Sequence, residues 1–154
     1  PNKDQWEQLI GRCVLAFNDI EYTTLLIFAN LLESRFPGAA KNLDMKHRLA
    51  VLLEVFDGSA DTGVQAVRAD LVEVERLLPK RNLIAHSAMH LDMSVSAQGA
   101  RMGGRLIGSR NARQTMSYQD LEALATGVDE LTTHLTDTVW KLINDRRLAE
   151  ADVR

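Results

Sequence analysis

The sequence predicts an all-α protein, an antiparallel bundle of about four to five helices with a small β-hairpin or long loop inserted. Apolar residues recur every three or four positions over most of the chain, which is the helical period. Breaks at Pro37 and Gly58 favour a bundle over a continuous coiled coil. Residues 91–115 lose the helical period and contain four glycines, which predicts the insertion.

Composition sets the broad class. At 154 residues, the chain is expected to form a single helical domain, residues 1–154, with a sizeable core. Hydrophobic content of 45% and charged content of 25% are those of an ordinary soluble protein. The single cysteine, Cys13, excludes an internal disulfide and fits a reducing compartment, so we expect a cytoplasmic protein. The most apolar run, residues 23–32, is too short for a membrane span.

The first predicted helix covers residues 4–34. Its second half is apolar on most sides, so we expect it to be central in the bundle or covered by a second subunit. Cys13 falls on the apolar stripe, which favours buried packing over reactivity. The stripe consists of Trp6, Leu9, Cys13, Phe17, Ile20, Thr24, Phe28 and Leu31.

Two further helices are predicted over residues 43–56 and 64–78. The segment at residues 57–59 breaks the chain between them, and Asp61 or Thr62 can cap the later helix. Their inward-facing residues are Leu49, Leu52, Leu53 and Phe56 in the first, and Val64, Val67, Leu71, Val74 and Leu78 in the second.

Within the 91–115 insertion, the alternation of Leu91, Met93 and Val95 predicts a strand, and residues 106–107 are its expected return partner. The last helix begins near Ser117, which forms a capping-box pattern with Asp120. Trp140 lies off its apolar stripe, where it can face a partner. That stripe consists of Leu121, Leu124, Val128, Leu131, Leu135, Val139 and Leu142.

The stretch KRNLIAH, residues 80–86, gathers the side chains best suited to chemistry. In a helix, Asn82 and His86 are four apart and share a face, and the long side chain of Arg81 can swing round beside them. Pro79 predicts a kink or a fresh helix start just before this stretch. A fresh start would leave free backbone N–H groups near Arg81, a setting that suits an anion.

The segment RNLIAH, residues 81–86, reads as arginine, a polar residue, three mostly apolar residues and histidine. It resembles the signature of the HEPN (higher eukaryotes and prokaryotes nucleotide-binding) superfamily. The resemblance implies an all-α bundle and, for many members, a metal-independent RNA endonuclease without a cofactor. It implies catalytic roles for Arg81, Asn82 and His86, and a homodimer in which two such motifs face one another across a composite active site. It also implies a toxin or phage-defence effector, with an antitoxin or regulatory protein as partner.

Basic residues concentrate around the motif. Residues 80–113 carry six basic residues and one acid, a net charge of +5, against −8 for the remainder. Guanidinium groups neutralise phosphates and pair with them, so this asymmetry favours contact with RNA. The alternative is a surface loop that is simply rich in arginine. The expected RNA-binding residues are Lys80, Arg101, Arg105, Arg110 and Arg113.

Glu21 and His90 are candidate accessory residues, and a zinc site is an alternative use of the histidines. Glu21 lies between apolar neighbours, which favours a solvated or edge position over a role as polar partner of the Arg81 site. His86 and His90 are four apart and can share a zinc ion, but no third ligand is obvious beyond Asp92. We therefore expect no metal, with His90 at most an accessory group. The sequence also lacks a Gly-rich phosphate loop and a nucleophile elbow, and its acidic helices offer no DNA recognition helix.

The residue types suggest a mechanism. An imidazole, whose ordinary pKa is about 6.5, can take the proton of an RNA 2′-hydroxyl or give one to the leaving 5′-oxygen. A guanidinium stabilises the charge that builds on the phosphate, and the products are a 2′,3′-cyclic phosphate and a 5′-hydroxyl end. One histidine cannot easily serve as both base and acid, so a two-fold pair makes chemical sense. The alternative function is a non-catalytic interaction or nucleotide-binding module.

Overall fold

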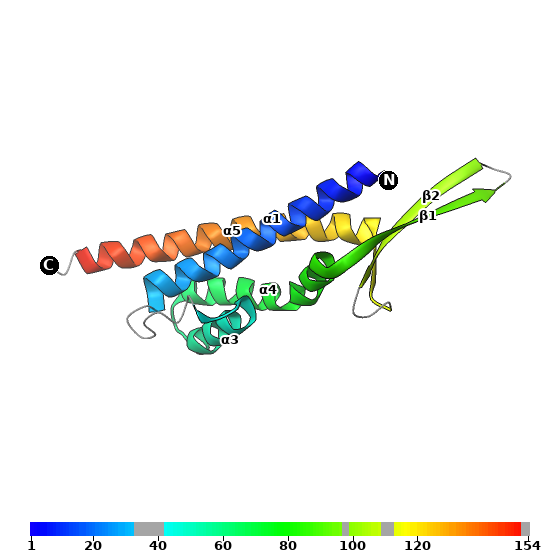
Figure 1. Ribbon diagram of the computed structural model, residues 1–154. Helices are drawn as coiled ribbons and strands as arrows, with labels where there is room; N and C mark the ends of the chain where they lie inside the picture. The colour runs from blue at the N-terminus through cyan, green and yellow to red at the C-terminus, as the bar shows by residue number, and fades with distance from the viewer. Residues whose placement is uncertain (33–41, 97–98, 109–112, 152–154) are drawn as a thin grey trace. The chain divides into compact units, whose positions relative to one another are not determined.

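The computed structural model confirms the predicted class: helices make up most of it, with a small antiparallel sheet (Figure 1). It describes residues 1–32, 42–96, 99–108 and 113–151, without the side chains of 88–103 and 146–151. In chain order the elements are α1 (Lys3–Ile27), the π-helical turn η1 (Phe28–Leu32), α3 (Met45–Phe56), α4 (Thr62–His86), β1 (Ser87–Ser96), β2 (Gly99–Gly108), β3 (Thr115–Ser117) and α5 (Tyr118–Ala151).

The chain divides into two compact units. Unit 1 consists of Pro1–Phe17 and Pro79–Asp129, and unit 2 of Asn18–Leu78 and Glu130–Arg154, so α1, α4 and α5 each contribute to both. The units differ in charge. The sequence of unit 1 has eight Lys and Arg against six Asp and Glu, a net +2, and that of unit 2 has ten against fifteen, a net −5. The cationic unit contains the RNLIAH motif.

Most buried apolar residues of unit 2 belong to the stripes that the sequence predicts to face the core. The turn η1 shifts the end of the first stripe by one residue, so that Leu32 is buried in place of Leu31. Polar pairs also link its helices: the hydroxyl oxygens of Thr23 and Thr136 are 3.3 Å apart, and His134 Nδ1 lies 2.7 Å from a carboxylate oxygen of Asp70. The buried residues include Ile20, Ile27, Phe28, Leu32, Met45, Leu49, Leu52, Phe56, Val64, Val67, Leu71, Val74, Leu135, Val139, Leu142 and Ile143.

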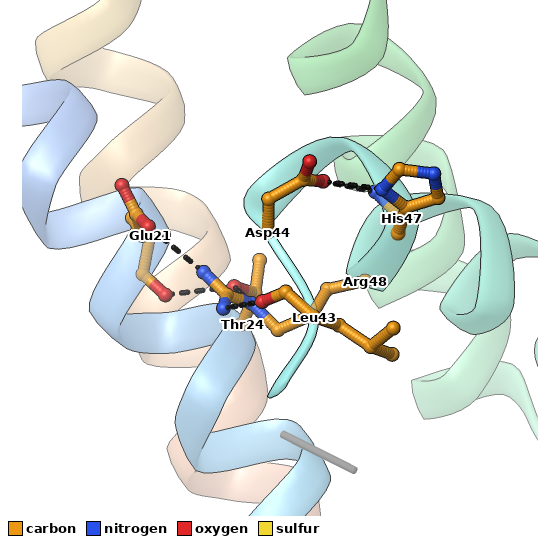
Figure 2. Close-up of polar contacts among 6 residues, drawn as sticks. All are labelled: Glu21, Thr24, Leu43, Asp44, His47 and Arg48. Atoms are coloured by element: carbon orange, nitrogen blue, oxygen red, sulfur yellow. Dashed lines mark hydrogen bonds and ion pairs between the residues drawn. The ribbon is translucent and has the colours of Figure 1, made fainter. Parts of the chain in front are cut away.

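Arg48 on α3 is a buried charge, only 4% exposed. Figure 2 shows its side chain next to Glu21, Thr24 and Leu43. Its guanidinium donates from Nη2 to Glu21 Oε1 at 2.9 Å and from Nε to Thr24 Oγ1 at 3.2 Å, and Nη1 donates to the carbonyl of Leu43. Burying a charge is costly unless it is paired and hydrogen-bonded, and here each of the three guanidinium nitrogens has an acceptor. The cluster therefore stabilises α3 against the second half of α1.

Local caps define the ends of α3 and the start of α4. Asp44 Oδ1 accepts from the backbone N–H of His47 at 2.9 Å, and its carboxylate also lies beside the His47 imidazole (Figure 2). Gly58 has φ of +68°, a conformation that favours glycine, in the turn after α3. Of the two expected caps of α4, the structure selects Asp61, whose carboxylate accepts from the N–H of Val64 at 3.1 Å and from that of the preceding residue.

Helix α4 does not start afresh before Arg81, so of the two expected outcomes the fresh start is wrong, and the kink stays a prediction. The helix is continuous over Thr62–His86, with Pro79 inside it. A proline in a helix interior costs about 3 kcal/mol. Packing offsets this cost, because Leu77 before the proline and Ile84 after it are both buried. The motif consequently occupies the C-terminal end of a long helix, and the predicted N–H groups near Arg81 lie within its hydrogen-bonding pattern.

The predicted hairpin is confirmed, with different boundaries. β1 and β2 pair antiparallel, and Ser87 at the start of β1 is opposite Gly108 at the end of β2. The first strand therefore begins four residues before Leu91, where the predicted alternation begins. Leu106 lies opposite Met89, nearer α4 than expected. A third strand, β3, which the sequence analysis did not predict, completes the order β1-β2-β3, with buried Met116 opposite buried Leu106.

Unit 1 packs the start of α1 against the start of α5. The ring of Trp6 is buried and meets that of Tyr118 edge to face, with 5.4 Å between ring centroids. Arg12 Nη2 lies 2.5 Å from Asp129 Oδ2. Cys13 is buried, as predicted, and burial, with a further contribution from the Asp129 carboxylate, raises the pKa of its thiol to about 11. Among the described residues, no helix combines the length and the apolar character needed to cross a bilayer.

The Arg48 cluster gives a test of the fold. Replacing Arg48 by alanine should lower the free energy of unfolding by about 2–3 kcal/mol, because three hydrogen bonds of a buried guanidinium are lost together with its ion pair to Glu21. The half-exposed Glu21 carboxylate can still reach water, so the loss should not exceed this range. Urea denaturation followed by circular dichroism measures the change.

Arg76 provides the matched control, since it forms an ion pair with Glu73 on the exposed face of α4. Its replacement by alanine should change the free energy of unfolding by less than about 1 kcal/mol. Equal stability of the Arg48→Ala and Arg76→Ala variants would contradict a stabilising role for the buried cluster.

Candidate functional site

The last turn of α4 carries the residues of the motif. Asn82 and His86 are both exposed and, as their spacing predicts, lie on one face of the helix, where they line the same hollow of about 460 Å³. This hollow, called the motif hollow below, lies within unit 1. Its described lining residues are Pro79, Asn82, Leu83, His86, Ser87, Gly108 and Gln114.

The hollow forms where a helix passes directly into a strand. α4 ends at His86 and β1 begins at the next residue, Ser87, without a loop (Figure 1). The Ser87 hydroxyl donates to the carbonyl of Leu83, which satisfies one acceptor of the last helical turn. Opposite Ser87, the backbone N–H of Gly108 donates to the carbonyl of Gln114 at 2.9 Å. Sheet pairing thus brings Gln114 to the motif residues across a long stretch of sequence.

Arg81 contacts Asn82, which lines the hollow. Its side chain is half-buried and is not among the described lining residues, but Nη1 lies 3.4 Å from Asn82 Oδ1. Because the Asn82 oxygen faces the guanidinium, the Nδ2 amide is the end of the carboxamide that can donate to a ligand. The structure therefore connects Arg81 to Asn82, and places Asn82 with His86.

Lys80 faces the start of α5. Asp120 accepts from the Ser117 hydroxyl at 2.6 Å, and its own backbone N–H donates to Ser117 Oγ at 3.1 Å, which confirms the predicted capping box. The Ser117 hydroxyl, then the Ser117 backbone N–H and the charge of Lys80, lower the pKa of Asp120. Part of the Lys80 charge is therefore offset by an α5 carboxylate.

Of the predicted RNA-binding arginines, Arg105 and Arg113 are exposed in unit 1. Arg105 is on β2 opposite Ser117, and Arg113 immediately precedes Gln114. Arg105 is therefore in the sheet, and Arg113 is next in sequence to a lining residue of the motif hollow.

Three other predicted site residues are described only in part or not at all. Arg101 is paired in register with Ser94, and His90 with Arg105, but the side chains of Arg101 and His90 are outside the described part of the structure. Arg110 lies outside the described residues altogether.

Glu21 belongs to unit 2, where Arg48 is its ion-pair partner at 2.9 Å. No three His, Cys, Asp or Glu side chains within the described ranges lie close enough together to hold a metal ion.

The position of the motif on α4 decides its local electrostatics. The C-terminal end of a helix carries a partial negative charge, equivalent to about half an elementary charge, which favours cations and opposes anions. His86 is the last residue of α4, and Asn82 is one turn before it. An anion held here therefore needs positive side chains, and Arg81 and Lys80 are the cations on the same turn.

Sequence reasoning missed Gln114, Ser87 and Gly108. The available signal was the short alternation of exposed Thr115, buried Met116 and exposed Ser117, which is typical of an edge strand. Pairing that strand with residues 105–107 would have brought Gln114 next to the end of β2. The register itself depends on contacts distant in sequence.

Comparisons of the whole chain with known protein families, with characterised proteins and with solved structures found no match. The interpretation of the motif hollow therefore depends on its geometry and chemistry.

The Asp120 cap gives a pH-dependent prediction. Since its pKa is lowered in the folded protein, ionised Asp120 stabilises the fold above the ordinary aspartate pKa of about 3.9, and this contribution is lost as pH falls through the lowered value. Wild type should therefore melt at a higher temperature than Asp120→Asn near pH 7, and the difference should shrink below about pH 4. Thermal denaturation across this range measures it.

The Ser117→Ala background separates the cap from other effects of the charge. There the Asp120→Asn substitution should have a smaller effect, because the Ser117 hydroxyl, the largest cause of the lowered pKa, is absent while the Ser117 backbone N–H and Lys80 remain. A pH-independent difference between wild type and Asp120→Asn would contradict this assignment.

Proposed function

We propose that this chain is a metal-independent RNA endonuclease that produces a 2′,3′-cyclic phosphate and a 5′-hydroxyl end. The observation that carries the proposal is the last turn of α4: Asn82 and His86 share one hollow, and the Arg81 guanidinium reaches the Asn82 carboxamide. These are the residues at which the sequence resembles HEPN ribonucleases.

In this mechanism His86 moves the protons. RNA carries a 2′-hydroxyl beside each phosphodiester, and cleavage requires its deprotonation and protonation of the leaving 5′-oxygen. An exposed imidazole at the edge of a hollow can approach either oxygen. The 2′-oxygen then forms a bond to phosphorus as the bond to the 5′-oxygen breaks, so water is not needed in this step.

Arg81 and Asn82 stabilise the phosphate during that exchange. Extra negative charge builds on its non-bridging oxygens, and a guanidinium pairs with such oxygens through a fixed set of donors. The Asn82 Nδ2 amide adds a neutral donor. Because the helix terminus opposes an anion, the positive charge of Arg81 is essential for binding and for the transition state.

The charge distribution of the sequence supports RNA as the substrate. Unit 1 has a net charge of +2 against −5 for unit 2, and Arg105 and Arg113 are exposed beside the sheet. A local cationic surface on an acidic protein directs a polyanion towards the site.

The proposal includes a homodimer, in which the second motif supplies the second proton-transfer group. Two His86 imidazoles facing one phosphate can act as base and acid, which one imidazole cannot easily do at once. By resemblance to HEPN toxins and phage-defence effectors, the dimer acts in the cytoplasm and is controlled by an antitoxin or regulatory protein.

A non-catalytic interaction module is the second candidate. Tyr22 is 60% exposed and Trp140 42% exposed, and both line a separate hollow of about 350 Å³ in unit 2. Exposed aromatic side chains in a hollow are typical of protein-binding surfaces. Without RNA cleavage, this surface would be the leading functional feature.

The catalytic prediction concerns His86 and Arg81. In the presence of EDTA, wild type should cleave single-stranded RNA, and His86→Ala should reduce the rate by about a hundredfold to ten-thousandfold. Arg81→Ala should reduce it by a similar factor, because removing one stabilising donor costs about a hundredfold to a thousandfold. Gel analysis of labelled RNA, with chemical identification of the cyclic phosphate, measures both.

Matched controls exist in unit 2. His47→Ala removes an exposed histidine, and Arg76→Ala removes an exposed arginine from the same helix as Arg81, so both should cleave like wild type. Unchanged activity in the His86→Ala and Arg81→Ala variants would mean that a contaminant cleaves the RNA.

The second prediction concerns binding without cleavage. In the His86→Ala background, the affinity for single-stranded RNA should fall with salt, with a log–log slope of about −0.7 for each phosphate neutralised. Removing Arg105 and Arg113 together should make this slope shallower by about 1.4. Fluorescence anisotropy at several salt concentrations measures it.

Lys46→Ala removes an exposed cation of unit 2 and is the control. If the slope of affinity against salt changed equally in the control and in the double arginine variant, this would contradict the proposal that Arg105 and Arg113 neutralise RNA phosphates.

A further inference from the structure

The polar side chains in the described part of the motif hollow's lining are uncharged. Asn82 and Gln114 contribute carboxamides, and the other described polar side chains are the His86 imidazole and the Ser87 hydroxyl. No lysine, arginine, aspartate or glutamate is among its described lining residues. A phosphate needs positive charge around it, whereas a nucleobase is flat and neutral and carries hydrogen-bonding groups on its edges.

The hollow also has apolar wall groups. Pro79 and Leu83 lie on α4 one turn apart, at the spacing that places side chains on one face of a helix. Apolar side chains accept the face of a base that has been removed from its stack. A volume of about 460 Å³ is within the range of small-ligand sites, which is about 300–1,000 Å³.

We propose that the motif hollow is a nucleobase subsite and that Gln114 is its specificity-determining residue. The proposal depends on the proposed function, because it takes RNA as the substrate. Gln114 presents a donor and an acceptor together, the pair that a carboxamide uses to read the edge of a base. Its side chain is exposed, while its backbone carbonyl is held by the N–H of Gly108 at 2.9 Å.

The arrangement assigns different tasks to different groups. The base enters the neutral hollow, and His86 lies on its lining, so the sugar of the same nucleotide comes to the imidazole. Arg81, which contacts Asn82 and is not among the described lining residues, stays with the phosphate. Recognition of one base then selects the phosphodiester that is cleaved.

The test is a titration of the four nucleoside 5′-monophosphates into ¹⁵N-labelled protein, followed by NMR at the side-chain amides of Gln114 and Asn82. Wild type should bind one of the four nucleotides about tenfold to a hundredfold more tightly than the weakest, the range expected for a paired carboxamide contact. Gln114→Leu, which keeps the size and removes both hydrogen-bonding groups, should bind all four similarly.

Gln119→Leu is the matched control, because Gln119 is exposed in the first turn of α5 and is not a described lining residue of the hollow. It should keep the wild-type preference. Equal binding of the four nucleotides by wild type, or an unchanged preference in Gln114→Leu, would overturn the subsite. So would inorganic phosphate that shifts the Gln114 amide as strongly as the preferred nucleotide does.

RNA cleavage distinguishes this proposal from the proposed function. A base preference that depends on Gln114, in a protein whose RNA cleavage does not depend on His86, would support the subsite and reject the nuclease. Cleavage that depends on His86, with both the 2′,3′-cyclic phosphate ends and the 5′-hydroxyl ends spread evenly over the four bases, would support the nuclease and overturn the subsite.

Discussion

The candidate site depends on one constraint, the passage of α4 into β1 without a loop. His86 ends the helix and Ser87 begins the strand, so the last helical turn and the base of the hairpin are fixed relative to each other by consecutive peptide bonds. Pairing of Ser87 with Gly108 then brings in the segment that carries Gln114. A loop at this junction would let the helix and the sheet move independently, and the hollow would lose its defined lining.

Arg48 and Arg81 differ in burial, and this difference matches the roles that we assign to them, a structural role for Arg48 and a proposed functional role for Arg81. Arg48 is enclosed, and Glu21, Thr24 and Leu43 supply its acceptors, so its hydrogen-bonding capacity is used within the protein. Arg81 is half-buried near the end of α4, and its Nη1 lies 3.4 Å from the carboxamide oxygen of Asn82. The proposed function needs a guanidinium that a phosphate can approach, and Arg81 is the less buried of the two.

The fold was predictable from the sequence where the signal is local. The helical stripes, the Ser117 cap and the shared face of Asn82 and His86 depend on residues three or four apart. Pro79 misled the prediction, because tertiary packing on both sides outweighs the lost hydrogen bond. Gln114 was missed for a related reason: strand register joins it to α4 across intervening sequence, and no local pattern specifies that pairing.

The direction of α4 has a consequence for catalysis. A fresh helix start at Arg81 would have supplied backbone N–H groups to a phosphate, whereas the observed C-terminal end presents carbonyl groups and a partial negative charge. In the proposed nuclease, backbone amides at this end of α4 are therefore not the groups that bind the phosphate, and side-chain cations take that role. The same terminus favours a neutral or cationic group next to it, which agrees with the uncharged side chains of the described lining and with the imidazole among them. Base and phosphate are then best held by different groups, the base by carboxamides and the phosphate by guanidinium.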